Sequence, residues 1–167
     1  ASDLRFVIGG KECIVIIGSM KVSKLPSLRR GWTTGACATA AVRAALTQLW
    51  GGLQLDQVQI TLPKGEQPIF QIAHRDSRNG WVEIGITKDA GDDPDVTHGA
   101  LIIARVSTSD SGINFHAGEG VGTITKAGLP IAVGEAAINP VPRKMMTAQV
   151  EELANLYGQS PDLDITI

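Results

Sequence analysis

Apolar residues recur at helical spacing in the segment that begins at Thr33 or Thr34 and runs to about Trp50. Its apolar positions are three or four residues apart, the spacing that forms one face of a helix: Val42, Ala45, Leu46 and Leu49. Threonine is a favoured N-cap residue, and the pair Gly51–Gly52 after the run is a helix stop signal. The pattern therefore predicts a helix over this segment.

A second helix is predicted to open in the segment INPVPRKMM, residues 138–146. Pro142 suits the first turn, where its missing N–H group costs nothing. Gly158 is the expected stop. The predicted apolar stripe of this helix consists of Met146, Val150, Leu153 and Tyr157.

Short alternating or apolar segments predict strands in the rest of the chain. The clearest is VQITL, which places Val58, Ile60 and Leu62 on one face. The others are a hairpin of residues 4–8 and 13–17 around Gly9–Gly10, and residues 68–73, 81–87, 100–106, 130–134 and 163–167. Strands do not alternate with helices, so a parallel doubly wound sheet is not expected. We predict an α+β fold, a mostly antiparallel sheet with two main helices packed on one face in two layers.

Length and composition favour a single folded domain. The chain has 167 residues, 43% of them apolar, which is enough for one core. We divide it into an N-terminal hairpin with a basic connector, residues 1–27, and an α+β domain, residues 28–167. Two cysteines are too few for a disulfide framework. Lys11 and Glu12 interrupt the apolar start, so the sequence predicts a cytoplasmic protein with no membrane partner.

The charge balance narrows the choice of partners. A formal net charge of −2 gives no global attraction to nucleic acid, so any anionic ligand must be bound by local clusters. His74, His98 and His116 are scattered, with no ligand spacing for a metal. No Ser-His-Asp arrangement is readable either.

The stretch LRRGWTTGACATAAVRAAL, residues 28–46, is a candidate anion site. A threonine cap, Gly35 and further small residues leave the first amides of the helix open to a ligand, and the helix dipole adds positive charge. Arg30 lies just before the helix and supplies a carboxylate partner. Cys37 lies one turn into the helix, where no partner base is found, so a small core residue is favoured. The alternative is a capped helix packed closely on the sheet.

The segment KDAGDDPDVTHG, residues 88–99, gathers four aspartates: Asp89, Asp92, Asp93 and Asp95. The spacing does not match a calcium loop, and aspartates are also common in turns. Four neighbouring carboxylates repel one another, which suggests a cation, a hydroxyl-rich ligand, or Lys88 and nearby arginines as partners. Gly91 belongs to this loop.

The segment GEGVGTITKAGLP, residues 118–130, contains the pattern GxGxG at Gly118, Gly120 and Gly122. This pattern resembles the nucleotide loop of class I methyltransferases, but no helical periodicity follows it, which excludes a dinucleotide fold on this loop. We expect either a glycine-rich tip whose backbone approaches a ligand, with Lys126 nearby, or an ordinary turn.

The start of the second predicted helix is a second candidate anion site. Asn139 and two prolines lead into it, and Arg143 and Lys144 lie in its first turn, where the helix dipole disfavours cations. A bound anion would explain them, whereas exposure to solvent is the plain alternative. Taken together, the basic clusters, helix starts and glycine loops predict a site for a large polyanionic small molecule.

These four segments together resemble the conserved blocks of the CbiD family, the cobalt-precorrin-5B C1-methyltransferases of anaerobic cobalamin biosynthesis. The resemblance covers Leu28 to about the end of the chain and only the first half of such proteins. It implies a cobalt-containing tetrapyrrole substrate with many carboxylate arms and S-adenosylmethionine as methyl donor. It also implies that this chain supplies the substrate-binding domain, which is inactive alone if the rest is required.

The motifs and the resemblance together assign the candidate residues. No catalytic residue and no metal ligand is assigned. Binding of the substrate is assigned to Arg30, Thr33, Thr34, Gly35, Cys37, Lys126, Asn139 and Arg143. Binding of S-adenosylmethionine is assigned to Asp89, Gly91, Asp92, Asp93, Asp95, Gly118, Gly120 and Gly122. The alternatives are a non-catalytic binding module for a polyanionic small molecule and a purely structural domain, and association into a homo-oligomer stays open.

Overall fold

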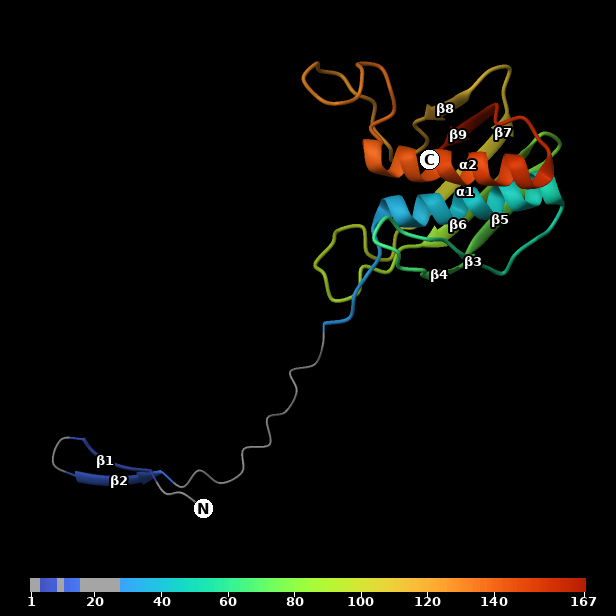
Figure 1. Ribbon diagram of the computed structural model, residues 1–167. Helices are drawn as coiled ribbons and strands as arrows, with labels where there is room; N and C mark the ends of the chain where they lie inside the picture. The colour runs from blue at the N-terminus through green and yellow to red at the C-terminus, as the bar shows by residue number, and fades with distance from the viewer. Residues whose placement is uncertain (1–3, 9–10, 16–27) are drawn as a thin grey trace.

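Two helices cover one face of a five-stranded sheet in the computed structural model, which describes residues 4–8, 11–15 and 28–167 (Figure 1). The sheet order is β5-β6-β7-β9-β8, with β5 at His74–Arg78, β6 at Trp81–Thr87, β7 at Leu101–Thr108, β9 at Leu163–Thr166 and β8 at Ile113–His116. All neighbouring strands are antiparallel except β8 and β9. The two-layer α+β fold expected from the sequence is confirmed.

The first helix, α1 (Thr34–Gly51), follows its sequence signals closely. The Thr33 side chain accepts a hydrogen bond from the Ala36 N–H at 3.1 Å, and Gly52 ends the helix in a left-handed conformation. The helix is buried on nearly all sides, because β6, β7, the second helix and a small ribbon surround it. Its many alanines therefore allow close packing, which was the alternative explanation for this stretch.

The second helix, α2 (Pro140–Tyr157), lies beside α1 on the same face of the sheet (Figure 1). Met146, Val150 and Leu153 are buried along its predicted stripe, and Gly158 is the C-cap. The helix lies in the connection between β8 and β9. These two strands are parallel, which requires a crossover of this kind rather than a hairpin.

Two pairs of strands lie outside the main sheet. β3 (Gln57–Gln59) and β4 (Ile69–Gln71) form an antiparallel ribbon whose buried Val58 and Phe70 belong to the core. β1 (Leu4–Ile8) and β2 (Lys11–Val15) pair as the predicted hairpin, with the second strand beginning earlier than expected. The predicted turn at Gly9–Gly10 and residues 16–17 lie outside the described residues.

One predicted strand is absent from the structure, and two observed strands were not predicted. β5 and β8 were not predicted: HRDSR lacks the apolar alternation that marks a half-buried strand, whereas INFH shows it at Ile113 and Phe115 over only four residues. The predicted strand at residues 130–134 is instead a series of bends and turns, in which Gly134 has a φ of 92°. Only Ile131 of this segment is buried, so its apolar composition does not reflect a place in the sheet.

Removing the cap of α1 is expected to destabilise the domain measurably. Thr33→Ala leaves the Ala36 N–H without its acceptor, and we expect a loss of about 1 kcal/mol of unfolding free energy in denaturant titrations. Thr34→Ala is the matched control, since the Thr34 side chain makes no hydrogen bond within the described residues. Equal effects of the two substitutions would contradict the assignment of the cap to Thr33.

Candidate functional site

The loops that carry the sequence motifs gather at one end of the domain. The N-termini of α1 and α2, the loop between β6 and β7 and the loop after β8 all lie at this end (Figure 1). Two clefts open here, and the residues that line them come mostly from the predicted motifs. We therefore treat this end as the candidate functional site.

The first cleft has a volume of about 560 Å³ and lies between the segment before α1 and the aspartate loop. It is lined by Leu28, Arg29, Arg30, Gly31, Trp32, Thr33, Ala90, Asp92, Asp93, Pro94 and Asp95. The two segments are joined through their backbones, because the Trp32 N–H donates to the Asp89 carbonyl at 2.8 Å and the Asp92 N–H donates to the Arg29 carbonyl at 2.9 Å. Glycines at positions 31 and 91 make this close approach feasible.

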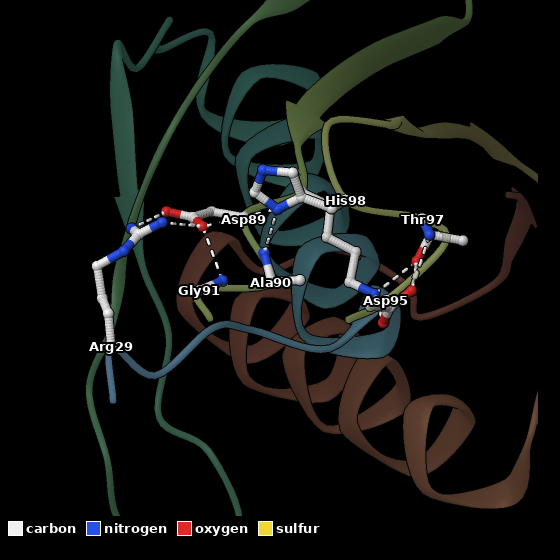
Figure 2. A network of polar contacts seen from close by, with 8 residues as sticks. Arg29, Asp89, Ala90, Gly91, Asp95, Thr97 and His98 are labelled. Carbon is white, nitrogen blue, oxygen red and sulfur yellow. Dashed lines mark hydrogen bonds and ion pairs between the residues drawn. The ribbon is translucent and has the colours of Figure 1, made fainter. Parts of the chain in front are cut away.

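The aspartate loop is held together largely by cations of the chain itself (Figure 2). Asp89 forms an ion pair with Arg29 and accepts the Gly91 N–H at 2.9 Å. The hydrogen bond from Arg29 lowers the pKa of the Asp89 carboxyl. Asp95 pairs with the Lys88 ammonium, and the hydrogen bond from Lys88 lowers the pKa of the Asp95 carboxyl strongly. Of the three kinds of partner expected for this loop, the structure shows the lysine and the arginine.

The other two aspartates of the loop lie at the first cleft. Asp92 accepts the Arg29 backbone N–H through Oδ2 at 2.5 Å. Asp93 is exposed, and its carboxylate has no hydrogen-bond partner within the described residues. Within the described lining of this cleft, Asp93 therefore leaves both carboxylate oxygens available to a ligand, and Asp92 leaves one.

Acid is expected to destabilise the folded domain through the Asp95 pair. The pKa of Asp95 is lower in the folded chain than in the unfolded chain, so the folded state binds fewer protons between the two values. This contribution to stability is complete above the unfolded pKa of about 4 and is lost as the pH falls towards the folded value.

Thermal unfolding midpoints measured between about pH 6 and pH 2 test this expectation. The midpoint should fall with pH, and Asp95→Asn should make that fall shallower. Asp93→Asn is the matched control from the same loop and should leave the slope unchanged. Identical slopes for the two variants would contradict a role of the Lys88–Asp95 pair in acid sensitivity.

The second cleft has a volume of about 610 Å³ and lies beside the start of β7 and the glycine-rich loop. An apolar wall from β7 forms one side, and the glycine-rich loop forms another. The lining residues are Thr34, Glu83, Thr97, Ala100, Leu101, Ile102, Ile103, Arg105, Gly118, Glu119, Gly120, Val121, Thr166 and Ile167. The cleft therefore combines one helix start, two loops and the end of β9.

The structure requires glycine for a different reason at each of the first two positions of the GxGxG pattern, and does not require it at the third. A Cβ at Gly118 would lie 2.8 Å from the Ile167 carbonyl oxygen, which accepts the Gly118 N–H at 2.7 Å. Gly120 has a φ of 85° and faces open space, whereas Gly122 shows neither constraint. The first two line the second cleft and Gly122 does not. Glu119, between them, is an exposed carboxylate that sequence reasoning did not single out.

A charged network beside the second cleft was also missed. Glu83 accepts hydrogen bonds from Arg105 Nε and Nη2 at 2.9 and 2.6 Å, and its other oxygen lies 2.9 Å from His74 Nε2. Burial acts to raise the pKa of Glu83, but the hydrogen bonds from His74 and Arg105 together lower it. The Arg105 guanidinium also lies 4.4 Å from the Trp81 ring centroid. Only the strand register, which sets Glu83 opposite Arg105, would have revealed this pair.

The candidate residues at the start of α1 are divided between different environments. Thr33 lines the first cleft and Thr34 lines the second. Arg30 lines the first cleft and forms an ion pair with Glu66. Gly35 lines neither, because a Cβ there would lie 2.6 Å from the Pro142 ring. Its small size serves the contact between the two helices.

Cys37 is a core residue, as the lack of a partner base in the sequence had led us to favour. Its side chain is fully buried, and burial raises the pKa of its thiol to about 11. A buried neutral thiol is a poor nucleophile and a poor anion ligand. Cys37 lines neither cleft, so the expectation that it contacts substrate has no support in this arrangement.

The start of α2 is poorly suited to bind an anion. Pro140 and Pro142 remove two of the N–H groups that a helix N-terminus would offer, and Asn139 makes no side-chain cap. Arg143 donates to the carbonyls of Ile138 and Ala136 at 3.0 and 2.8 Å.

The other basic candidates do not alter this picture. The remaining amino group of Arg143 pairs with Glu135 at 2.9 Å, so its guanidinium holds the preceding segment of chain. Lys126 is exposed in the loop after β8. None of Asn139, Arg143 and Lys126 lines either cleft.

Both clefts carry their arginines as ion pairs rather than as free cations. Arg29 pairs with Asp89, Arg30 with Glu66 and Arg105 with Glu83. Within the part of the chain that the structure describes, no group of three or more His, Cys, Asp and Glu side chains could hold a metal ion. Neither described helix is both long and apolar enough to cross a bilayer. The site can offer paired charges, backbone groups and apolar walls to a ligand.

Comparisons with known proteins agree on one family. A family model described as CbiD matches residues 21–167. A cobalt-precorrin-5B C(1)-methyltransferase from Brucella anthropi is 57% identical over 149 residues, which cover 88% of this chain and 40% of that protein. A protein of the same name from Rhodospirillum rubrum is 59% identical over 143 residues, which cover 84% of this chain and 39% of that protein.

A solved structure is also similar in fold. It is the crystal structure of the cobalamin biosynthesis protein CbiD from Archaeoglobus fulgidus, with a TM-score of 0.59 and 28% sequence identity. The match covers 83% of this chain and 43% of that one. The chain thus spans about 40% of the length of the curated relatives that it matches.

Proposed function

The chain belongs to the CbiD family, and on this premise we propose that it forms the substrate-binding part of a methyltransferase of cobalamin biosynthesis. The reaction is transfer of a methyl group from S-adenosylmethionine to a ring carbon of a cobalt-precorrin in the cytoplasm. The observation that carries the proposal is the 57% and 59% identity to two proteins named cobalt-precorrin-5B C(1)-methyltransferase. The chain spans about 40% of the length of those proteins, so the complete reaction is itself part of this proposal.

The second cleft is the better candidate for the methyl donor. Its β7 wall is apolar and suits an adenine ring, and Gly120 lies beside open space where a backbone can approach a ligand. The exposed Glu119 carboxylate suits ribose hydroxyls or a sulfonium charge. These residues fit S-adenosylmethionine, whereas all four aspartates first assigned to it line the first cleft or pair with cations of the chain.

The first cleft is the better candidate for an edge of the tetrapyrrole. Trp32 offers an aromatic surface, and Arg30 lies 5.8 Å from its ring centroid. Arg29 and Arg30 are more than half exposed although they are ion-paired, so a substrate carboxylate can compete for either guanidinium. Thr33 lines the first cleft and the adjacent Thr34 lines the second. Ligands bound in the two clefts would therefore lie close together at the start of α1.

The contribution of this chain to the reaction is then mainly positioning. S-adenosylmethionine supplies an electrophilic methyl group on a sulfonium that is a good leaving group. The chain orients the ring carbon by holding the substrate edge, and the apolar wall of the second cleft excludes water from its neighbourhood. Glu119 adds a negative charge near the mouth of that cleft, which favours a cationic ligand. No residue of the described chain is needed as a nucleophile.

Calorimetric titrations of the chain with S-adenosylmethionine and with a carboxylate-rich cobalt corrinoid test this proposal. We expect both to bind, and we expect Glu119→Gln to weaken S-adenosylmethionine by roughly tenfold or more, the effect of losing a charged hydrogen-bond partner. Glu151→Gln, at an exposed position of α2, is the matched control and should change neither affinity.

Three other results would redirect the assignment. Corrinoid binding without S-adenosylmethionine binding would place the donor site in residues that only the longer relatives possess, and would favour a binding module. Equal effects of the two glutamine variants would remove Glu119 from the site. If neither ligand bound to the chain, while a full-length relative bound both, the substrate-binding role of this part would be rejected.

A further inference from the structure

Lys88 is the charged residue that the fold buries most completely. Its side chain is 2% exposed, and it is the only charged side chain in the buried core of the described residues. Lysine is almost never fully buried unless it is paired, because removing an ammonium group from water is costly. None of the binding roles discussed above uses Lys88, so its burial calls for a separate explanation.

The Lys88 ammonium ties together the far side of the aspartate loop. It donates to the Asp95 carboxylate and to Thr97 Oγ1, the latter at 2.6 Å. The second oxygen of Asp95 accepts the Thr97 N–H at 2.8 Å and the Thr97 hydroxyl at 2.6 Å. Figure 2 shows Asp95 and Thr97 joined in this way. The three side chains form a closed network in which each polar group has a partner.

The backbone of Lys88 closes the base of the same loop. Its N–H donates to the Ala100 carbonyl at 2.9 Å, and its carbonyl accepts the Gly99 N–H at 2.8 Å. Lys88 therefore fixes the loop at two places: its backbone binds residues 99 and 100 at the base, and its side chain binds Asp95 and Thr97. A loop fixed at both places has little freedom to move independently of β6 and β7.

The two side-chain partners of Lys88 belong to different clefts. Asp95 lines the first cleft and Thr97 lines the second, so the loop is a wall that the two clefts share. Asp95 is 36% exposed, and water can hydrate it if the ammonium is removed. The loss of the Lys88 charge would then loosen the wall without leaving an unpaired charge in the core.

We propose that Lys88 is a positioning residue that fixes the wall shared by the two clefts, so that both ligands depend on it. Lys88 touches neither ligand and acts through Asp95 and Thr97. The ligand part of this statement rests on the proposed function, whereas the ordering of the loop does not.

Amide hydrogen exchange of the chain without any ligand tests the ordering role. In Lys88→Met, which keeps the length and apolar stem of the side chain, the amides of Thr97, His98 and Gly99 should exchange roughly 10- to 100-fold faster. Amides at the centre of β6 and β7 should keep their rates. Lys144→Met, at an exposed lysine of α2, is the matched control. Unchanged loop rates, or equal acceleration of loop and sheet, would overturn the proposal.

A second variant allows the same test if Lys88→Met fails to fold. Asp95→Asn removes the charge partner at a partly exposed position and should accelerate exchange in the same three amides, in the same direction. Loop rates that stay at the unsubstituted value in Asp95→Asn would overturn the proposal as well.

Ligand titrations then separate this proposal from the proposed function. Lys88→Met should weaken both S-adenosylmethionine and the cobalt corrinoid, whereas Glu119→Gln should weaken only the former. An effect of Lys88→Met on the affinity for only one ligand would contradict the proposal that Lys88 fixes a wall shared by both clefts. If the unsubstituted chain bound neither ligand, the proposed function would fail, and the exchange rates alone would still decide whether Lys88 orders the loop.

Discussion

Replacing Gly31 with alanine is expected to lower the unfolding free energy by about 3 kcal/mol and to open the first cleft. A Cβ at this position would lie 1.8 Å from the Ala90 carbonyl carbon and 2.0 Å from its oxygen. Backbone atoms cannot rotate away as the end of a flexible side chain can, so the two segments must separate. The hydrogen bond from the Trp32 N–H to the Asp89 carbonyl would be lost with them.

Denaturant titration measures the cost of Gly31→Ala, and hydrogen exchange at the Trp32 amide locates it. Gly122→Ala is the matched control, because a Cβ there meets nothing within 4 Å and the backbone does not require glycine. We expect a change close to zero for the control. A Gly31→Ala variant that is as stable as the control, with a protected Trp32 amide, would contradict the close approach of the two segments.

Replacing Arg143 with methionine is expected to destabilise the domain by about 2–3 kcal/mol. The guanidinium is half-buried and donates to the Ile138 and Ala136 carbonyls, and it also pairs with Glu135. Methionine fills much of the same space but leaves these acceptors without a donor. The segment before α2 should then detach from the start of that helix, and its amides should exchange faster.

The same variant distinguishes a structural arginine from an anion anchor. If Arg143 held a substrate carboxylate, as its place at the start of α2 had suggested, Arg143→Met would reduce corrinoid affinity and leave stability unchanged. Lys144→Met is the control, since its side chain is exposed and has no ion pair within the described residues. We expect stability to fall in the first variant and to remain constant in the second.

The elements that the sequence predicted well are those with strong local signals. α1 and α2 combine apolar periodicity with a cap or stop residue, such as Thr33 and Gly158, and both signals act within one helix. β6, β7 and β9 are apolar on the face that packs under the helices. β5 and β8 lie at the two edges of the sheet, where fewer neighbours bury them. HRDSR in β5 carries no apolar residue, and INFH in β8 alternates over only four residues, so the local signal for a strand was absent in the first and short in the second.

The sequence predicted which segments contribute to the candidate site, but not how their residues are arranged in space. The motifs do meet at one end of the domain, yet Thr33 and Thr34 line different clefts although they are adjacent in sequence. Residue type alone could not show that Gly35 packs against Pro142 of the other helix, or that the Arg143 side chain turns back to the carbonyls of the residues before α2. The pairing of Glu83 with Arg105 depends on the register between β6 and β7, which the apolar pattern within either strand alone does not reveal.

The most direct test of the account is a map of ligand-induced amide chemical shifts on the isotopically labelled chain. S-adenosylmethionine should perturb residues 101–103 and 118–121, and the cobalt corrinoid should perturb residues 29–33 and 92–95, while the C-terminal turns of α1 and α2 stay unchanged. Perturbations centred on those C-terminal turns, at the opposite end of the domain, would contradict the assignment of the functional site.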